Sequence, residues 1–420
     1  MFNFFKKNKP NIQEEWNSKG EQYTSAINKM VEFGEKNGWE NWKGEEPQDK
    51  RNHLANEILS LLRTANREQK TDLFRESFPP AHEPFIPFLE KQGQSIEMLH
   101  FIDNQKIVFL TGTSYQKRQA YILDNDIILE LEDNITAIGK SKRGNIFAIA
   151  VLGKISTYNG WEGPLIAEFI LNETAEFGIT ELVPFNDGKK ILLVTSEGIY
   201  LIVKDAEKLI HPLNESNDED WSPNIDMENA TLSNDNAYIV AGDQCYDHAI
   251  MDAEGNTLGN IGPQSSYPHF CLFSHDDGQL ITNSCHFYSG ITIGIDADKL
   301  KGANVEPYTE SDQYNVIDGN MRVYAGVAID DYYILGDAYG YIKAFDKNGI
   351  KRWQHFLGST ISGITASDDG HTLWVASCSG MIHKLLLGKG HRDKHTIGDG
   401  NHYEEFRLLI WKEESQPLKW

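Results

Sequence analysis

The 420-residue chain has few cysteines, no long apolar run and a deficit of basic side chains. Its four cysteines show no Cys-x-x-Cys spacing, so we expect neither a disulfide framework nor a cysteine zinc site. The longest apolar run, Ile146 to Leu152, is far too short to cross a bilayer. The first residues place apolar side chains before lysines, which reverses the order of a signal peptide. We therefore expect a cytoplasmic protein.

The shortage of positive charge disfavours nucleic acid and membranes as partners and favours a basic protein. The chain has 39 Lys and Arg against 62 Asp and Glu, a net charge of -23. The imbalance lies almost wholly in residues 95–420, because residues 1–94 are close to neutral. Such a surface disfavours nucleic acid and anionic membranes as partners, because both are bound by clustered Lys and Arg. It is compatible with a basic protein partner, which an acidic face attracts and steers.

Catalytic motifs are also missing. The chain has no G-x-S-x-G elbow, no P-loop and no local Ser/His/Asp arrangement. The segment "GKGHRDKH" holds His391, Arg392 and His395, but it lies in a glycine-rich stretch without a neighbouring Cys or carboxylate set of zinc spacing. We interpret it as a solvated loop that could contact a partner, and we expect no metal, no cofactor and no catalytic residue.

Residues 1–94 are predicted to form a small α-helical region. Asn11 followed by Glu14 is a helix start, and Tyr23, Ile27 and Met30 then share one helical face. A second helix is expected around Leu54 to Leu62, and a third, short piece is expected to end before two prolines. The Pro-rich stretch that follows is interpreted as a connection.

Residues 95–420 repeat a strand, a polar turn and a second strand. The turns are centred near residues 104, 144, 188, 236, 278, 331 and 370, which are 39 to 53 residues apart. A period of about 44 residues is the length of a four-stranded antiparallel blade. We therefore predict a mainly β fold, a seven-bladed β-propeller, with blades that start near residues 95, 134, 179, 225, 269, 319 and 361.

One segment shows the outer half of a blade clearly. In "GYIKAFDKNGIKRW", a strand is followed by a turn at Asp346 to Gly349 and then by a strand with Trp353. The run "EEFRLLIWKEE" near the C-terminus is predicted to be either the last strand of the seventh blade or a strand that pairs with the first blade and locks the ring.

The segment Ala344 to Trp353 resembles the repeat of PQQ-like, quinoprotein-type propellers, and the wider Asp-Gly, strand, Gly, strand rhythm resembles WD40-type propellers. The resemblance implies the fold. The blade that contains Asp252 has Gly259 in the place of Trp353, and no copy has the Gly-His and Trp-Asp pairs of WD40 repeats. No set of central quinone ligands is matched, so the resemblance implies no cofactor here.

An acidic loop between two blades is the sharpest candidate for partner binding. Asp218, Glu219 and Asp220 precede Trp221, which combines charge for steering with an aromatic anchor. A solvated loop is the alternative interpretation.

Three functions are compatible with these patterns. The first is a non-catalytic protein-binding propeller, in a specific form an immunity or antitoxin-type protein that neutralises a basic toxin. The second is a propeller enzyme, a hydrolase or lyase that acts at the central channel. The third is an assembly scaffold in which helices and propeller hold different partners.

Overall fold

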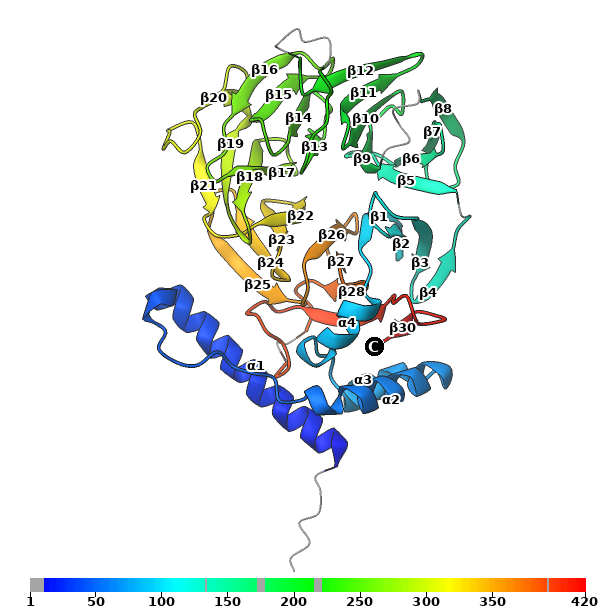
Figure 1. The fold of residues 1–420 in the computed structure, drawn as a ribbon, viewed down its shortest axis with the longest axis vertical. Coiled ribbons are helices and arrows are strands. Elements are labelled where there is room, and N and C mark those ends of the chain that lie inside the picture. The colour runs from blue at the N-terminus through cyan, green and yellow to red at the C-terminus, as the bar shows by residue number, and fades with distance from the viewer. Residues whose placement is uncertain (1–10, 133, 172–177, 215–220, 391–392) are drawn as a thin grey trace, which may run out of the picture.

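The computed structural model describes residues 11–132, 134–171, 178–214, 221–390 and 393–420. Seven β-sheets surround a central channel, and helices pack against one side of the ring (Figure 1). In each sheet the strands are paired in chain order, from an inner strand at the channel to an outer strand at the rim. The predicted seven-bladed propeller with N-terminal helices is confirmed. No described helix is both long enough and apolar enough to cross a membrane.

The first three blades each have four strands. Blade 1 contains β1 (Ile96–Asp103), β2 (Lys106–Thr111), β3 (Gln119–Asp124) and β4 (Ile127–Glu130). Blade 2 contains β5 (Ile135–Lys140), β6 (Ile146–Val151), β7 (Lys154–Asn159) and β8 (Leu165–Ile170). Blade 3 contains β9 (Ile179–Pro184), β10 (Lys190–Thr195), β11 (Gly198–Val203) and β12 (Ala206–His211).

Blades 4 and 5 share a long segment of chain that lies between two strands of blade 5. Blade 4 contains β13 (Asn229–Leu232), β14 (Tyr238–Gly242), β15 (His248–Asp252) and β16 (Thr257–Ile261). Blade 5 contains β17 (Tyr267–Phe273), β18 (Gln279–His286), β19 (Ser289–Asp296) and β21 (Asn315–Asp318). The chain between β19 and β21 makes a 3-10 turn (Ala297–Lys299) and returns to blade 4, where β20 (Asn304–Val305) pairs in parallel with β16.

The last two blades complete the ring. Blade 6 contains β22 (Val323–Ile329), β23 (Tyr332–Asp337), β24 (Tyr341–Asp346) and β25 (Lys351–Phe356). Blade 7 contains β26 (Ile361–Ala366), β27 (Thr372–Ser377), β28 (Met381–Leu386), β29 (Tyr403–Leu409) and β30 (Leu418–Lys419). The C-terminal run is therefore the outer part of blade 7, the first of the two alternatives. Trp353 lies on β25, after a turn in which Gly349 has a φ of 81°.

The turns between the first and second strands explain the regular rhythm of the sequence. Each of the seven turns has a residue with positive φ, in the left-handed region that Gly, Asn and Asp tolerate best. These residues are Asn104, Gly144, Gly188, Asn236, Asp277, Asp330 and Gly370. They coincide to within one residue with the turn centres that the sequence predicts.

Because the strands alternate in direction, the two ends of the channel differ. We call the end at which the inner strands finish the exit face, and the end at which they begin the entry face. The exit face holds the turns just described. The entry face holds the turns between second and third strands and the connections from one blade to the next.

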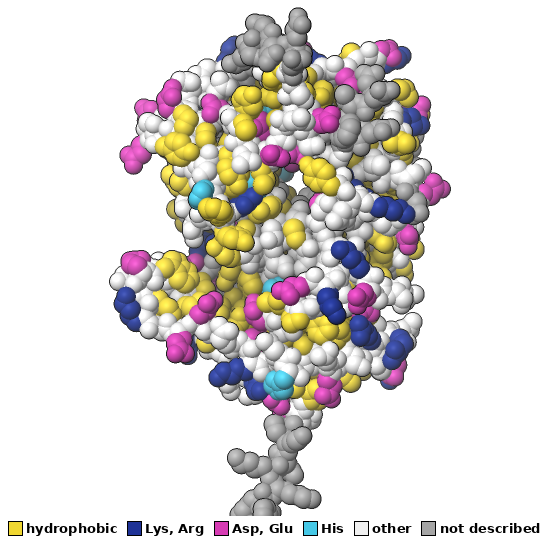
Figure 2. Space-filling model, in the orientation of Figure 1, with side chains coloured by type: hydrophobic (Ala, Val, Ile, Leu, Met, Phe, Trp, Pro, Cys, Tyr) yellow, Lys and Arg dark blue, Asp and Glu magenta, His cyan; other side chains and the backbone are white. Residues whose placement is uncertain are grey.

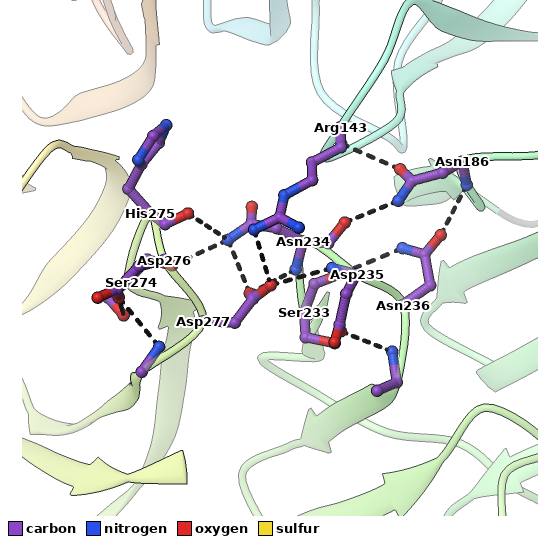
Figure 3. A network of polar contacts seen from close by, with 12 residues as sticks. Arg143, Asn186, Ser233, Asn234, Asp235, Asn236, Ser274, His275, Asp276 and Asp277 are labelled. Atoms are coloured by element: carbon purple, nitrogen blue, oxygen red, sulfur yellow. Dashed lines mark hydrogen bonds and ion pairs between the residues drawn. The ribbon is translucent and has the colours of Figure 1, made fainter.

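A polar network joins four blades on the exit face (Figure 3). Asn186 of blade 3 accepts from the Arg143 N–H at 3.0 Å and donates to the Asn234 carbonyl of blade 4 at 2.7 Å. Asp277 of blade 5 accepts from the Asn234 N–H at 2.6 Å and lies 3.3 Å from the Arg143 guanidinium of blade 2. The side chains of one turn thus provide hydrogen-bond partners for the backbone groups of a neighbouring turn.

The ring closes through packing between blade 7 and blade 1. Trp374 stacks on Phe101 with ring centroids 5.5 Å apart, and both side chains are buried in one apolar cluster. The Ser362 hydroxyl donates to the Ile96 carbonyl at 2.6 Å, which joins the two inner strands. No strand is exchanged between the first and last blades among the described residues.

The described part of the N-terminal region, from residue 11 on, contains four helices and three short 3-10 segments. The helices are α1 (Ile12–Asn37), α2 (Ala55–Arg67), α3 (Thr71–Ser77) and α4 (Ile86–Gln92). The 3-10 segments are Trp39–Asn41, Asn52–Leu54 and Glu83–Phe85. Asn11 caps α1 as expected, since its side chain accepts from the Gln13 N–H. The Pro-rich connection is itself partly helical, because prolines at the first positions of α4 cost no hydrogen bond.

The helices share a hydrophobic core with blade 7. Ile58 and Trp16 are fully buried in a cluster that also contains Met381, Leu409 and Trp420. The Trp420 ring lies 6.3 Å from the Trp16 ring, and its indole N–H donates to the Phe78 carbonyl at 2.8 Å. This packing makes the helices and the last blade one unit.

We predict that Ile58→Ala destabilises the whole chain by about 2 to 5 kcal/mol, because it opens a cavity in the shared core. Leu61→Ala on the same helix is the control, since Leu61 is 36% exposed, and it should change stability by about 0.5 kcal/mol or less. Urea unfolding followed by circular dichroism and by tryptophan fluorescence measures both. A variant that loses helical signal well before the propeller unfolds would contradict a shared core.

Candidate functional site

Exposed aromatic side chains gather on the entry face, over blades 5 and 6. We call Phe287, Tyr288, Tyr308, Tyr324 and Tyr339 the aromatic patch; they are 38 to 70% exposed. Figure 2 shows hydrophobic side chains beside the central opening over β17–β19 and β22–β24, next to a histidine and a basic side chain. Large exposed aromatics that lie together are typical of binding surfaces.

The patch is assembled from short turns and connections. Phe287 and Tyr288 form the turn between β18 and β19, and Tyr339 lies in the turn between β23 and β24. The rings of Tyr288 and Tyr339 are 5.7 Å apart, so the two turns touch across the blade boundary. The Tyr308 hydroxyl donates to the Ser266 carbonyl at 3.4 Å, which ties the loop after β20 to the same surface.

Arg322 is the centre of the patch. Its guanidinium donates to the Phe287 carbonyl at 2.6 Å and lies 4.8 Å from the centre of the Tyr324 ring. It also reaches the Met227 sulfur at 3.7 Å, in the connection that leads into blade 4. One arginine therefore contacts three neighbouring blades and packs on the ring of Tyr324.

The His269 side chain on β17 forms a hydrogen bond with Arg322. Its Nδ1–H donates to the Val323 carbonyl at 2.7 Å, which leaves Nε2 to accept from the Arg322 guanidinium at 3.1 Å. Burial, assisted by the neighbouring positive charge of Arg322, lowers the pKa of His269 to about 4. The imidazole is therefore neutral at pH 7, as an acceptor for Arg322 must be.

Carboxylates surround the aromatic patch. The entry-face segments of blades 4 to 6 contain one Arg, no Lys and seven Asp or Glu. These segments are residues 221–228, 243–247, 262–266, 286–289, 306–314, 319–322 and 338–340. Asp226, Glu228, Asp247, Glu306, Glu310 and Asp312 are exposed or half-buried and form the acidic rim. The seventh, Asp243, is buried and lies 2.6 Å from His211 Nε2. An apolar centre with an acidic rim is complementary to a basic protein surface that carries apolar side chains.

The central channel is a second polar site, with a volume of about 1080 Å³. Burial raises the pKa of Glu181 on β9 to about 7, although Lys142 opposes this shift. Burial lowers the pKa of Lys142, against the attraction of Glu181. His100 also lines the channel; its Nε2 donates to the Ile138 carbonyl at 3.0 Å.

Among the described residues, no group of three His, Cys, Asp or Glu side chains is placed to hold a metal ion. The acid–base groups of the channel are Glu181 on β9 and Lys142 in the turn between β5 and β6.

Of the site residues predicted from sequence, the structure describes Trp221 and His395. Asp218, Glu219 and Asp220 fall outside the described residues, and the neighbouring Trp221 is half-buried in the connection from blade 3 to blade 4, on the entry face. His391 and Arg392 also fall outside the described residues. His395 lies against α1 rather than in solvent, and its side chain is only 9% exposed.

Sequence reasoning missed the aromatic patch. The signal was present in "HFYSG" and "DAYGY", where turns between strands carry large aromatic residues in place of the usual small polar ones. Tyr324 and Arg322 could not be associated with these turns from sequence, because the contacts join residues that are 35 to 95 positions apart.

No protein-family model matches the chain, and no curated protein matches it at a significant level.

We predict that the protein loses stability as the pH falls from 7 to 5, in part through His269. In the unfolded chain this histidine has its ordinary pKa of 6.5, so the unfolded state binds its proton first. The stabilisation is complete above pH 6.5 and declines toward the folded pKa of about 4. His269→Gln should reduce the loss of unfolding free energy between pH 7 and 5 by up to about 2 kcal/mol.

Urea unfolding at the two pH values measures this difference. His371→Gln, at an exposed position on the exit face, is the control and should leave the pH dependence as in the wild type. Glu181 acts with the opposite sign, because its raised pKa adds stability as the pH falls below 7. Equal pH dependence of the wild type and His269→Gln would contradict a neutral, buried His269.

Proposed function

We propose that the protein is a non-catalytic, protein-binding propeller whose entry face docks a basic protein. The observation that carries this proposal is the aromatic patch around Arg322 with its rim of carboxylates. Tyrosines and arginines dominate binding energy when they lie at the centre of an interface. The fold supports this role, since the patch is built on turns between strands and needs no large rearrangement to bind.

The net charge favours a specific form of this function. An acidic propeller that blocks the cationic site of a toxin, such as a nuclease, would act as an immunity or antitoxin-type protein. The carboxylates would raise the rate of association, and the apolar centre would slow dissociation. Trp221, which lies on the same face, is a further contact in this proposal.

A channel enzyme, a hydrolase or lyase, is the second candidate. It is favoured by the Glu181–Lys142 pair, because a carboxyl group with a pKa of about 7 suits general acid–base catalysis at neutral pH. Glu181→Gln would abolish such an activity and would leave partner binding at the entry face unchanged. The two functions are therefore separable by one substitution.

We predict that the double variant Tyr288→Ala, Tyr339→Ala weakens partner binding by at least about 30-fold, which corresponds to about 2 kcal/mol for loss of a hot spot. The partner is first captured from the native host at low salt and identified by mass spectrometry, and its affinity is then measured by calorimetry at 50 mM and 500 mM salt. We expect a basic protein that binds less tightly at the higher salt concentration.

Tyr115→Ala is the matched control. Tyr115 is 74% exposed in the turn between β2 and β3 of blade 1, on the same face but away from the patch. It should leave the affinity within about twofold of the wild type. A partner that binds the double variant as tightly as the wild type, or that is indifferent to salt, would exclude this docking mode.

A further inference from the structure

A second cavity lies between the N-terminal helices and blades 6 and 7. Its volume is about 510 Å³, in the range of small-molecule sites. The walls come from α1, α3, the end of β25, residues 393–397 and the start of β29. The cavity opens to solvent at its edge, where Asp72 and Asp393 are exposed. It is separate from the aromatic patch and from the central channel.

Four side chains that line this cavity are at least nine-tenths buried and hold polar atoms without a hydrogen-bond partner. The side chains are His355, His395, His402 and Arg407. The unpartnered atoms are His355 Nδ1, both ring nitrogens of His395, His402 Nε2 and Arg407 Nη1. Buried polar groups are nearly always satisfied, so their concentration around one cavity points to a bound polar molecule.

The hydrogen bonds already present define what these atoms offer. His402 Nδ1 accepts from the Gly388 N–H at 3.3 Å, so the ring proton of the neutral form is on Nε2, which is a free donor. Burial lowers the pKa of His355 and of His402 to about 4, and both rings are neutral at pH 7. A neutral His355 or His395 ring offers one donor and one acceptor.

The charges in the cavity wall are already paired. Arg51 makes a two-point contact with Asp49, with its Nε at 2.9 Å and its Nη2 at 2.6 Å from the carboxylate oxygens. Glu404 accepts from Arg407 Nε at 2.9 Å, from Arg75 Nη2 at 2.9 Å and from His383 Nδ1 at 2.8 Å. Only Nη1 of the Arg407 guanidinium remains free to donate to a ligand.

The charges that are left at the cavity edge disfavour a strongly charged ligand. An anion would face the carboxylates of Asp72, Glu76 and Asp393 at the cavity edge, and a cation would face Arg407. A hydroxyl group, in contrast, both donates and accepts. It therefore matches a wall that offers N–H donors from His402 Nε2 and Arg407 Nη1, one unpartnered ring nitrogen of His355, and both ring nitrogens of His395.

Two residues of α1, Gly20 and Asn28, position the cavity wall. Gly20 of α1 lets two side chains approach the helix, because a Cβ at this position would lie 2.5 Å from Arg51 Nη1 and 3.1 Å from His395 Nδ1. Asn28 of α1 donates to the Thr396 carbonyl at 2.9 Å and accepts from the Gly398 N–H at 3.0 Å. The segment that carries His395 is thereby fixed beside the cavity.

We infer that this cavity binds an uncharged, polyhydroxylated small molecule, a sugar or a cyclic polyol, through His355, His395, His402 and Arg407. The ligand fills the space between the N-terminal helices and the propeller and stabilises their contact by mass action. This site is independent of partner docking on the entry face.

Calorimetry and thermal unfolding of the full chain with D-glucose, trehalose and myo-inositol test the inference, with phosphate and citrate as charged controls. We expect saturable binding of at least one of the three polyols and none of either anion. His402→Phe removes the Nε2 donor and should weaken that binding at least tenfold. His402→Gln retains an N–H in its place and should stay within threefold of the wild type.

High concentrations of sugar stabilise most proteins without binding, so a variant comparison is decisive. His371→Phe, at an exposed position on the exit face, is the control and should bind as the wild type does. The inference is overturned if none of the polyols gives saturable heat and all variants gain the same thermal stability. It is also overturned if phosphate or citrate binds in place of a polyol.

Discussion

The structure depends on the packing of the last blade against the first. Blades 1 and 7 are each built from their own stretch of chain, so no strand pairing among the described residues holds the ring shut. The stacked pair of Phe101 and Trp374, with the apolar side chains around it, supplies the closing contact. Burying two large aromatic side chains contributes several kcal/mol, a large share of the net stability of a domain. The N-terminal helices also stabilise the last blade, because their core side chains pack on blade 7.

This arrangement gives the two ends of the channel different roles. The exit-face turns need residues that tolerate positive φ, and their Asn and Asp side chains also satisfy the backbone of the next blade. Their sequence is therefore constrained by folding. Phe287, Tyr288 and Tyr339 lie in entry-face turns and are 59 to 70% exposed. Folding does not require large aromatic residues there, which makes a binding role the better explanation for them.

The sequence predicts the fold well because its strongest local signals, the positive-φ turns between first and second strands, occur once in each blade. Asn104 and Gly370 mark the first and the last of them, and both are readable without knowledge of any contact. The first helix is equally local, from the Asn11 cap to Gly38. The sites are not local. Arg322 meets His269 from 53 positions away, and His402 shares a cavity with α1. His395 reads as a loop residue in sequence and is buried only because Gly20 lets it approach the helix.

Blade 6 links the two proposed binding sites and shows how they are held. Asp337, which is 2% exposed, accepts from the Tyr339 N–H at 2.9 Å and from the Tyr341 N–H at 2.8 Å. The Leu357 N–H, at the edge of the helix–propeller cavity, donates to the Gly340 carbonyl at 2.8 Å. The turn that presents Tyr339 is thus fixed by a buried carboxylate and a backbone bond. A partner that docks there meets a preformed surface, and the conformational entropy lost on binding is correspondingly small.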